Sequence, residues 1–137
     1  MVRIVNGEMV PTDGVLAGEA AEEVVAYHRE ITRNANRSEA GARISALFGG
    51  KTDMSLVVTQ MNMQARVSEI VNAKADGAAT AEELAELAVY HGIFSQIKAI
   101  RMAENTASAA LDAAGTDTNM TPGERTAEIN AVPVTWP

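Results

Sequence analysis

The sequence predicts an all-α protein of three to four helices that includes a long antiparallel helical hairpin. Apolar residues recur at helical spacing through most of the region between residues 18 and 114, and signals for helix starts and stops separate these runs. The chain is 47% apolar but has only one Trp, two Tyr and two Phe, so small and aliphatic side chains supply most of its apolar surface. Such side chains suit close packing of helices within or between chains.

Length and charge limit the classes of function. A chain of 137 residues fits one domain. Its formal net charge of −7 and its scattered basic residues exclude the clustered positive charge that nucleic-acid binding needs. No run of apolar residues is long enough to span a membrane, and no secretory signal is visible, so we expect a soluble chain that does not insert into membranes. Because cysteine is absent, disulfides and thiol chemistry are excluded.

Residues 1–14 predict an N-terminal arm, either a short β-hairpin or an unstructured terminus. Asn6-Gly7 is the dipeptide best suited to the positive φ angles of a two-residue hairpin turn, and alternating residues flank it. A two-stranded hairpin is marginal in water unless other parts of the chain cover it, so both interpretations stay open. Turn residues follow, and Thr12 or Asp13 is suited to cap the next helix.

A first helix is predicted from about residue 18 to residue 33. Its apolar face would contain Val24, Tyr27 or His28, and Ile31, with Glu and Arg residues on the opposite face. This pattern is typical of an amphipathic helix at the surface of a core.

The stretch 32–43 is the most polar part of this region. Asn34, Asn36 and Gly41 are weak helix formers, and they favour a break in the helix, although a continuous helix stays open. Helical spacing resumes afterwards and ends at Gly49-Gly50, which predict a helix stop.

A second helix is predicted from Asp53, which suits the N-cap position, to about Ala75. Its apolar residues leave little purely polar face in the first turns, so we expect this helix to make contacts on more than one side. Within it, a 4-3 spacing typical of a coiled-coil seam links Leu56, Gln60, Met63, Val67 and Ile70.

The clearest local signal is a capping box formed by Thr80 and Glu83, whose side chains each satisfy a free backbone amide. The helix that it opens can run to Ala114, with Gly115 as the stop, over on the order of 50 Å. Because a short connection precedes it, this helix and the second should form an antiparallel hairpin with facing seams. Its seam has 3-4 spacing and consists of Tyr90, Ile93, Ile97, Ile100, Glu104, Ala107, Leu111 and Ala114.

The C-terminal segment predicts a polar link, a short helix and an extended tail. Thr121 and Pro122 mark the start of a helix of about two turns, and Pro133 and Pro137 favour extended backbone after it. Trp136 is then either a latch on its own chain or an anchor in a neighbour. The sequence thus divides into the arm at 1–14, a helical domain at 15–115 and this segment at 116–137.

No catalytic, cofactor-binding or metal-binding constellation is recognisable. Carboxylate-bridged di-metal bundles carry Glu three residues before each His, and neither His28 nor His91 has one. No serine lies in a Gly-x-Ser-x-Gly elbow. The run from Gly49 to Thr52 lacks the earlier glycine of a phosphate-binding loop, because residue 45 is Ser. We therefore expect a protein that is not an enzyme, with no cofactor, metal or small-molecule substrate.

Three pieces of sequence occur in order within residues 59–108: TQMNMQAR at 59–66, TAEE at 80–83 and IKAIR at 97–101. Through them the chain resembles small helical tail-associated structural proteins of tailed bacteriophages. The resemblance covers roughly a third of the chain. It implies a helical hairpin packed in a tail tip, fibre or baseplate in several copies, within a virion whose parts are made in the host cytoplasm. It implies no catalytic residues.

These observations together predict a structural component of a larger assembly, which binds copies of itself and neighbouring structural proteins. A monomeric helical adaptor or regulator in the cytoplasm, which binds a partner peptide or protein, is the alternative. An enzyme with a composite site formed only in an oligomer is the least favoured class. The residues predicted to form the interface are Met54, Met61, Met63, Ile93, Ile97, Ile100, Leu111 and Trp136.

Overall fold

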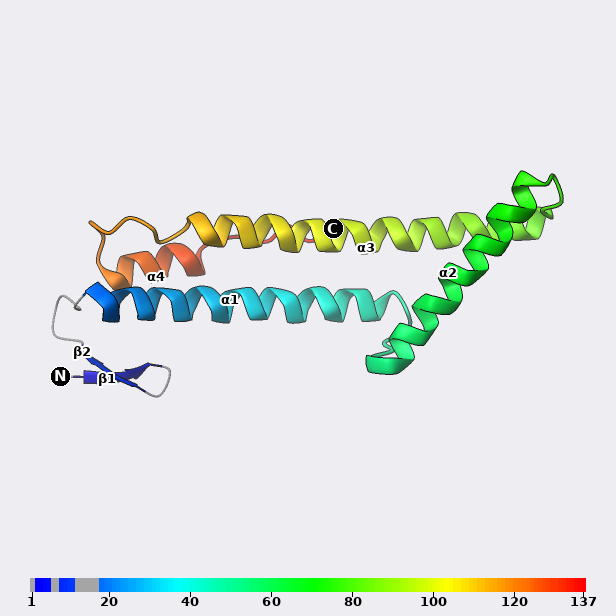
Figure 1. The fold of residues 1–137 in the computed structure, drawn as a ribbon. Coiled ribbons are helices and arrows are strands. Elements are labelled where there is room, and N and C mark those ends of the chain that lie inside the picture. The colour runs from blue at the N-terminus through cyan, green and yellow to red at the C-terminus, as the bar shows by residue number, and fades with distance from the viewer. Residues whose placement is uncertain (1, 6–7, 12–17) are drawn as a thin grey trace. The chain divides into compact units, whose positions relative to one another are not determined.

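The computed structural model describes residues 2–5, 8–11 and 18–137, and this part of the chain contains four α-helices (Figure 1). The predicted all-α class is therefore confirmed. The helices are α1 (Gly18–Ala46), α2 (Asp53–Ala75), α3 (Ala81–Ala113) and α4 (Pro122–Asn130).

Two short strands precede the helices. Strand β1 (Val2–Val5) pairs with β2 (Glu8–Pro11) in antiparallel register, with Val5 opposite Glu8. The turn predicted at Asn6-Gly7 and the cap predicted at Thr12 or Asp13 lie outside the described residues.

Contacts divide the chain into two compact units, each with its own core. The first unit consists of Met1–Glu39 and Ala103–Thr135, and the second of Ala40–Met102 and Trp136–Pro137, so α1 and α3 contribute residues to both. In the first unit one cluster contains Ala21 and Val24, and another contains Val25, Leu111 and Ile129. The buried cluster of the second unit contains Ala40, Ile44, Phe48, Met63 and Ile100.

Helix α1 runs without interruption through residues 32–43, so the break favoured there is wrong. Long-range contacts offset the weak helix formers. The Arg33 guanidinium donates from Nε to the Ser108 hydroxyl at 3.0 Å and forms an ion pair with Asp112. Within the helix, Arg37 donates to the Asn34 side-chain oxygen at 3.2 Å. These contacts stabilise the helical conformation at the positions where intrinsic propensity is weak.

The predicted apolar face of α1 is confirmed at Val24 and Tyr27 but is wrong at Ile31. Ala21, Val24 and Val25 are buried, whereas Ile31 is 47% exposed. Tyr27 is half-buried and packs beside the Val24 cluster. The core of the first unit therefore takes its apolar residues from the first turns of α1 and not from a stripe that extends to Ile31, and Ala40 and Ile44 near the end of the helix enter the core of the second unit.

An arginine from α1 binds the carbonyl groups at the end of α3. Arg29 donates from Nε to the carbonyl of Leu111 and from Nη2 to the carbonyl of Ala114, each at 2.8 Å. The last carbonyl groups of a helix have no partner within it, so these bonds satisfy two acceptors that α3 leaves free.

A second arginine, Arg125 in α4, is buried beside the same helix end. It donates from Nε to the Gly115 carbonyl at 2.6 Å, and its two terminal nitrogens bind the Glu22 carboxylate at 2.8 and 3.2 Å. Gly115, the predicted stop, has a φ of +68°, and a Cβ there would lie 2.9 Å from the Arg125 carbonyl oxygen. Only glycine fits this turn without displacing α4.

Two of the predicted helix caps are confirmed and one is wrong. The amide of Thr80 donates to the Glu83 carboxylate, and the amide of Glu83 donates to the Thr80 hydroxyl, both at 3.1 Å. Thr121 likewise accepts from the amide three residues on, at 3.2 Å. At α2, however, the N-cap is Thr52, which has extended backbone angles, and Asp53 is the first helical residue with a φ of 53°. The turn through the preceding glycines places the cap one residue earlier than predicted.

Helices α2 and α3 are joined by residues 76–80 as a helical hairpin. All residues of both predicted seams are buried or half-buried. In the second unit, Met63 from α2 and Ile100 from α3 lie in one buried cluster, against which Ile93 and Ile97 pack. The 4-3 and 3-4 spacings therefore identify the faces that form the core.

Candidate functional site

Helix α2 has two apolar faces on roughly opposite sides. The seam residues form one face, which is turned into the second unit. The other face, here named the Met/Val face, consists of Met54, Val57, Val58 and Met61, at the i, i+3, i+4, i+7 spacing of a single helix side. Their exposed fractions are 71%, 47%, 46% and 63%. The expected second apolar side of α2 is thus present and uncovered in this chain.

The segment that carries the Met/Val face has no charge. Residues 54–65 contain no Asp, Glu, Lys or Arg, although Asp53 and Arg66 flank them. The centres of protein interfaces are depleted in charged residues and enriched in Met. Unbranched methionine side chains also adapt to irregular partner surfaces. The Met/Val face therefore has the composition of a contact surface.

The eight predicted interface residues lie in three different environments. Met54 and Met61 are exposed on the Met/Val face. Ile93, Ile97 and Trp136 are half-buried against the core of the second unit, where Met63 and Ile100 are buried. Leu111 is buried in the first unit with Val25 and Ile129. Of these eight residues, only Met54 and Met61 are more than half exposed.

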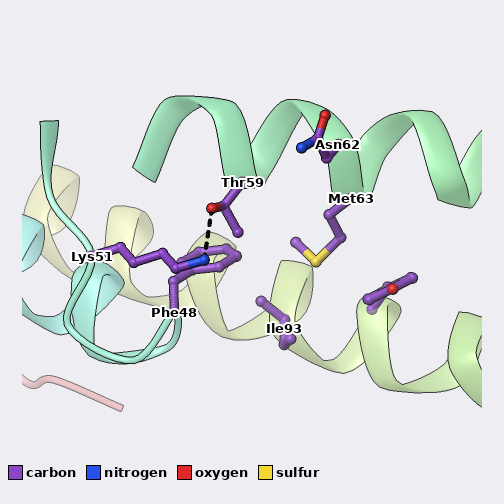
Figure 2. Close-up of a pocket in the computed structure, with 7 residues that line it drawn as sticks. Phe48, Lys51, Thr59, Asn62, Met63 and Ile93 are labelled. Carbon is purple, nitrogen blue, oxygen red and sulfur yellow. Dashed lines mark hydrogen bonds between the residues drawn. The ribbon is translucent and has the colours of Figure 1, made fainter. Parts of the chain in front are cut away.

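A pocket of about 400 Å³ lies beside the buried seam of α2, within the second unit. Figure 2 shows Met63 and Ile93 pointing toward each other across it, with Phe48 from the segment after α1 at one end. Lys51 and Thr59 contribute polar groups, and the Asn62 amide points outward from the rim. The seventh lining residue is Tyr90. The pocket therefore combines an apolar wall with a cationic edge.

The segment after α1 positions Lys51 at this edge. Gly49 and Gly50 have φ angles of 68° and 81°, which allow the chain to turn sharply. The Ser45 hydroxyl donates to the Lys51 carbonyl at 2.6 Å, and the Lys51 ammonium donates to the Thr59 hydroxyl at 3.2 Å. No carboxylate lines the pocket, so an anionic group entering it would meet the ammonium without competition from the wall.

A charged network outside the pocket orients Tyr90, one of the residues that line it. Arg66 on α2 donates from Nε to the two oxygens of Glu86 at 3.1 and 3.3 Å, and the Tyr90 hydroxyl donates to Glu86 at 2.7 Å. The bonds from Arg66, and then from Tyr90, hold the pKa of the Glu86 carboxyl below its ordinary value of 4.5. The bond to Glu86 in turn raises the pKa of the Tyr90 hydroxyl. A charged Glu86 therefore connects α2 to α3 and orients Tyr90.

The sequence analysis missed Lys51 and Thr59 as neighbours of a pocket. Glu86 and Tyr90 stand at i, i+4 spacing, which predicts their contact on one helix side. The approach of Lys51 to Thr59 depends on the turn at Gly49-Gly50, whose direction no local pattern specifies.

Among the described residues, no group of three or more His, Cys, Asp and Glu side chains is placed to hold a metal ion. None of the helices in this same part of the chain is long and apolar enough to cross a membrane.

Comparisons of this chain with protein-family models, with curated proteins and with solved structures found no match.

Proposed function

We propose that this protein is a structural, non-catalytic subunit that assembles in several copies through the Met/Val face of α2. The observation that carries the proposal is an exposed, charge-free apolar stripe on the side of α2 opposite its buried seam. The resemblance of residues 59–108 to tail-associated phage proteins supports a place in a tail tip, fibre or baseplate of a virion, beside neighbouring structural proteins.

A second copy is the partner that the surface suits best. The Met/Val face carries no charged residue, so neither copy has to bury a charge when two such faces meet. The chain has a net charge of −7, which disfavours approach of copies through their charged surfaces. The uncharged segment 54–65 is therefore the part of α2 at which close approach is least opposed.

The size of the face favours several contacts over a single isolated pair. The exposed fractions of its four side chains add up to roughly two whole side chains, so burying them contributes about 3–7 kcal/mol per copy. Association of two proteins costs about 4–15 kcal/mol in lost translational and rotational freedom. The net free energy of association of one pair of faces is therefore close to zero, and repeated contacts in a multi-copy assembly add to its stability.

The test is the oligomeric state as a function of concentration, measured by light scattering behind size exclusion with circular dichroism on the same fractions. We expect a helical oligomer, and we expect the double variant Met54→Gln, Met61→Gln to dissociate it. Met102→Gln is the matched control, because Met102 on α3 is exposed by 57% but lies outside the Met/Val face. A fully helical monomer at high concentration would contradict assembly through this face.

Changes in the seam, such as Ile97→Asp with Ile100→Asp, would not separate assembly from folding, because Ile100 is buried in the core of its own unit. An aspartate there would unfold the chain whether or not it assembles. The glutamine variants at Met54 and Met61 avoid this ambiguity because both side chains already face solvent.

The pocket beside α2 favours a second candidate function, a helical adaptor. Its apolar wall and the Lys51 ammonium suit an apolar side chain that is flanked by a carboxylate, as in an acidic amphipathic peptide. The test is a methyl NMR titration with such a peptide. Binding would shift the signals of Met63 and Ile93 but not that of Met102, and Lys51→Gln would weaken it. A monomer that binds the peptide in this way would favour the adaptor over the structural subunit.

A further inference from the structure

The C-terminal tail after α4 is held by side-chain packing and not by backbone hydrogen bonds. Helix α4 ends at Asn130, and the amide of Val132 makes the last backbone hydrogen bond after it, to Ile129 at 3.3 Å. Among the described residues, no backbone–backbone hydrogen bond involves residues 133–137. Pro133 and Pro137 have no amide hydrogen to donate. The tail therefore has no ladder of hydrogen bonds that would tie it to one position.

Trp136 is the anchor of this tail. Its ring packs, half-buried, against the buried cluster of the second unit that includes Ala40, Ile44 and Phe48. The guanidinium carbon of Arg43 lies 5.0 Å from the ring centroid, within the range of a cation–π contact. Trp136 was predicted to pack either on its own chain or in a neighbour, and in this structure it packs on its own chain. The surface formed by Arg43 and this cluster is named the Trp cradle.

We propose that the Trp cradle also accepts Trp136 from a second copy, so that C-terminal tails exchange between copies. This inference rests on the proposed function, because exchange needs copies held close together. The contact between ring, guanidinium and cluster is chemically the same within a chain and between chains. Exchange requires the Trp136 ring to leave the cradle of its own chain, but no backbone hydrogen bond of residues 133–137 has to be replaced.

Local concentration decides between the two arrangements. A short tether gives a ligand an effective concentration of about a millimolar at its own site, which favours the latch in dilute solution. Copies packed in an assembly present neighbouring tails at comparable concentration, and exchange of identical segments is a low-cost route to linked subunits. The tail would then add a second contact to the one made by the Met/Val face.

The first experiment uses a synthetic peptide of residues 131–137 and the full-length Trp136→Ala variant. Trp136 is the chain's single tryptophan, so this variant has none and all tryptophan fluorescence comes from the peptide. We expect a saturable blue shift of that fluorescence. Adding Arg43→Gln should weaken binding about 2- to 5-fold by removing the cation–π contact, whereas Arg37→Gln, a control on the same helix, should not. Absence of a saturable shift in the folded variant would overturn the proposal.

If Trp136→Ala lowers helicity, the same peptide with 5-fluorotryptophan is titrated into the wild-type chain. A new bound fluorine signal, from displacement of the internal latch, supports the proposal, and its absence up to millimolar peptide overturns it.

The second experiment separates tail exchange from the proposed function. On the Met54→Gln, Met61→Gln background, a protein concentration of about a millimolar takes the place of the Met/Val face in bringing copies together. Sedimentation velocity at that concentration should detect a dimer that is absent in dilute solution, and adding Trp136→Ala should abolish this dimer. Peptide binding without this dimer would make Trp136 only an internal latch and would overturn exchange. Failure of the Met/Val face, in contrast, leaves peptide binding to the cradle unchanged.

Discussion

Met61 and Met63 stand two residues apart on α2, yet the structure assigns them opposite environments. Met61 is 63% exposed on the Met/Val face, whereas Met63 is 7% exposed in the core of the second unit. Replacing each by alanine therefore separates folding from assembly. Met63→Ala removes a buried side chain and should lower the free energy of unfolding by about 2–5 kcal/mol. We expect the lower half of that range, because Met63 borders an open pocket into which its neighbours can relax.

Met61→Ala removes a side chain of which only about a third is covered, so the free energy of unfolding should fall by at most about 1 kcal/mol. If the Met/Val face is an interface, the exposed part of the Met61 side chain is buried on assembly, and this burial contributes about 1–2 kcal/mol per copy to the free energy of association. The association constant should then fall about 5- to 30-fold for each copy that contributes a face.

The assay pairs urea unfolding, followed by circular dichroism at low concentration, with sedimentation velocity at high concentration. The expected result is a stability loss confined to Met63→Ala and an association loss in Met61→Ala. Equal destabilisation by the two changes would refute the assignment of Met61 to an exposed face of α2 and of Met63 to a buried one. An unchanged association constant for Met61→Ala would refute its role in assembly.

Three further outcomes follow from the ion pairs and the helix ends. Arg66 lowers the pKa of the Glu86 carboxyl, so the ionised carboxylate stabilises the fold above its ordinary pKa of 4.5, and this stabilisation is lost as pH falls through the folded-state pKa. Glu86→Gln should therefore flatten the decline of the urea midpoint on acidification. A decline identical to that of the wild type would contradict this. Arg125→Met leaves the Gly115 carbonyl without its donor and should lower the unfolding free energy by about 1–3 kcal/mol in chemical denaturation. Gly115→Ala should lower the melting temperature measurably, because its Cβ would lie 2.9 Å from the Arg125 carbonyl oxygen and 3.0 Å from the Ile129 side chain; an unchanged melting temperature would show that α4 shifts freely.

Much of the fold was predictable because its signals are local. The Thr80 capping box needs only residues three apart, and the Gly115 stop needs only one residue with positive φ. The seams of α2 and α3 follow from a period set by helix geometry. Such features are encoded within a few turns, and long-range contacts do not have to be known.

The continuity of α1 was not predictable in this way. Asn34, Asn36 and Gly41 are weak helix formers, and the residues that offset them, Ser108 and Asp112, lie more than seventy positions away in the sequence. Intrinsic propensity amounts to less than about 1 kcal/mol per residue, so a few tertiary contacts are enough to reverse it.

The candidate site, too, was predictable only in part from the sequence. The sequence already indicated contacts on more than one side of α2, because the apolar residues leave little purely polar face in its first turns. The 4-3 spacing also identified the stripe that packs inside the chain. It did not show that Met63, predicted at the interface, is buried whereas Met54 and Met61 are exposed, because that depends on what packs against the helix.

Sequence patterns were therefore sufficient for the helix class, the caps at Thr80 and Thr121 and the residues that share each helix face. Tertiary structure decided that Met63, Ile100 and Leu111 are buried within the chain, that α1 is unbroken, that Arg125 binds the end of α3 and that Trp136 packs on its own chain. The physical reason is that the first set depends on hydrogen bonds and periodicity within a few turns. The second depends on contacts between residues far apart in the sequence, whose meeting only the folded chain determines.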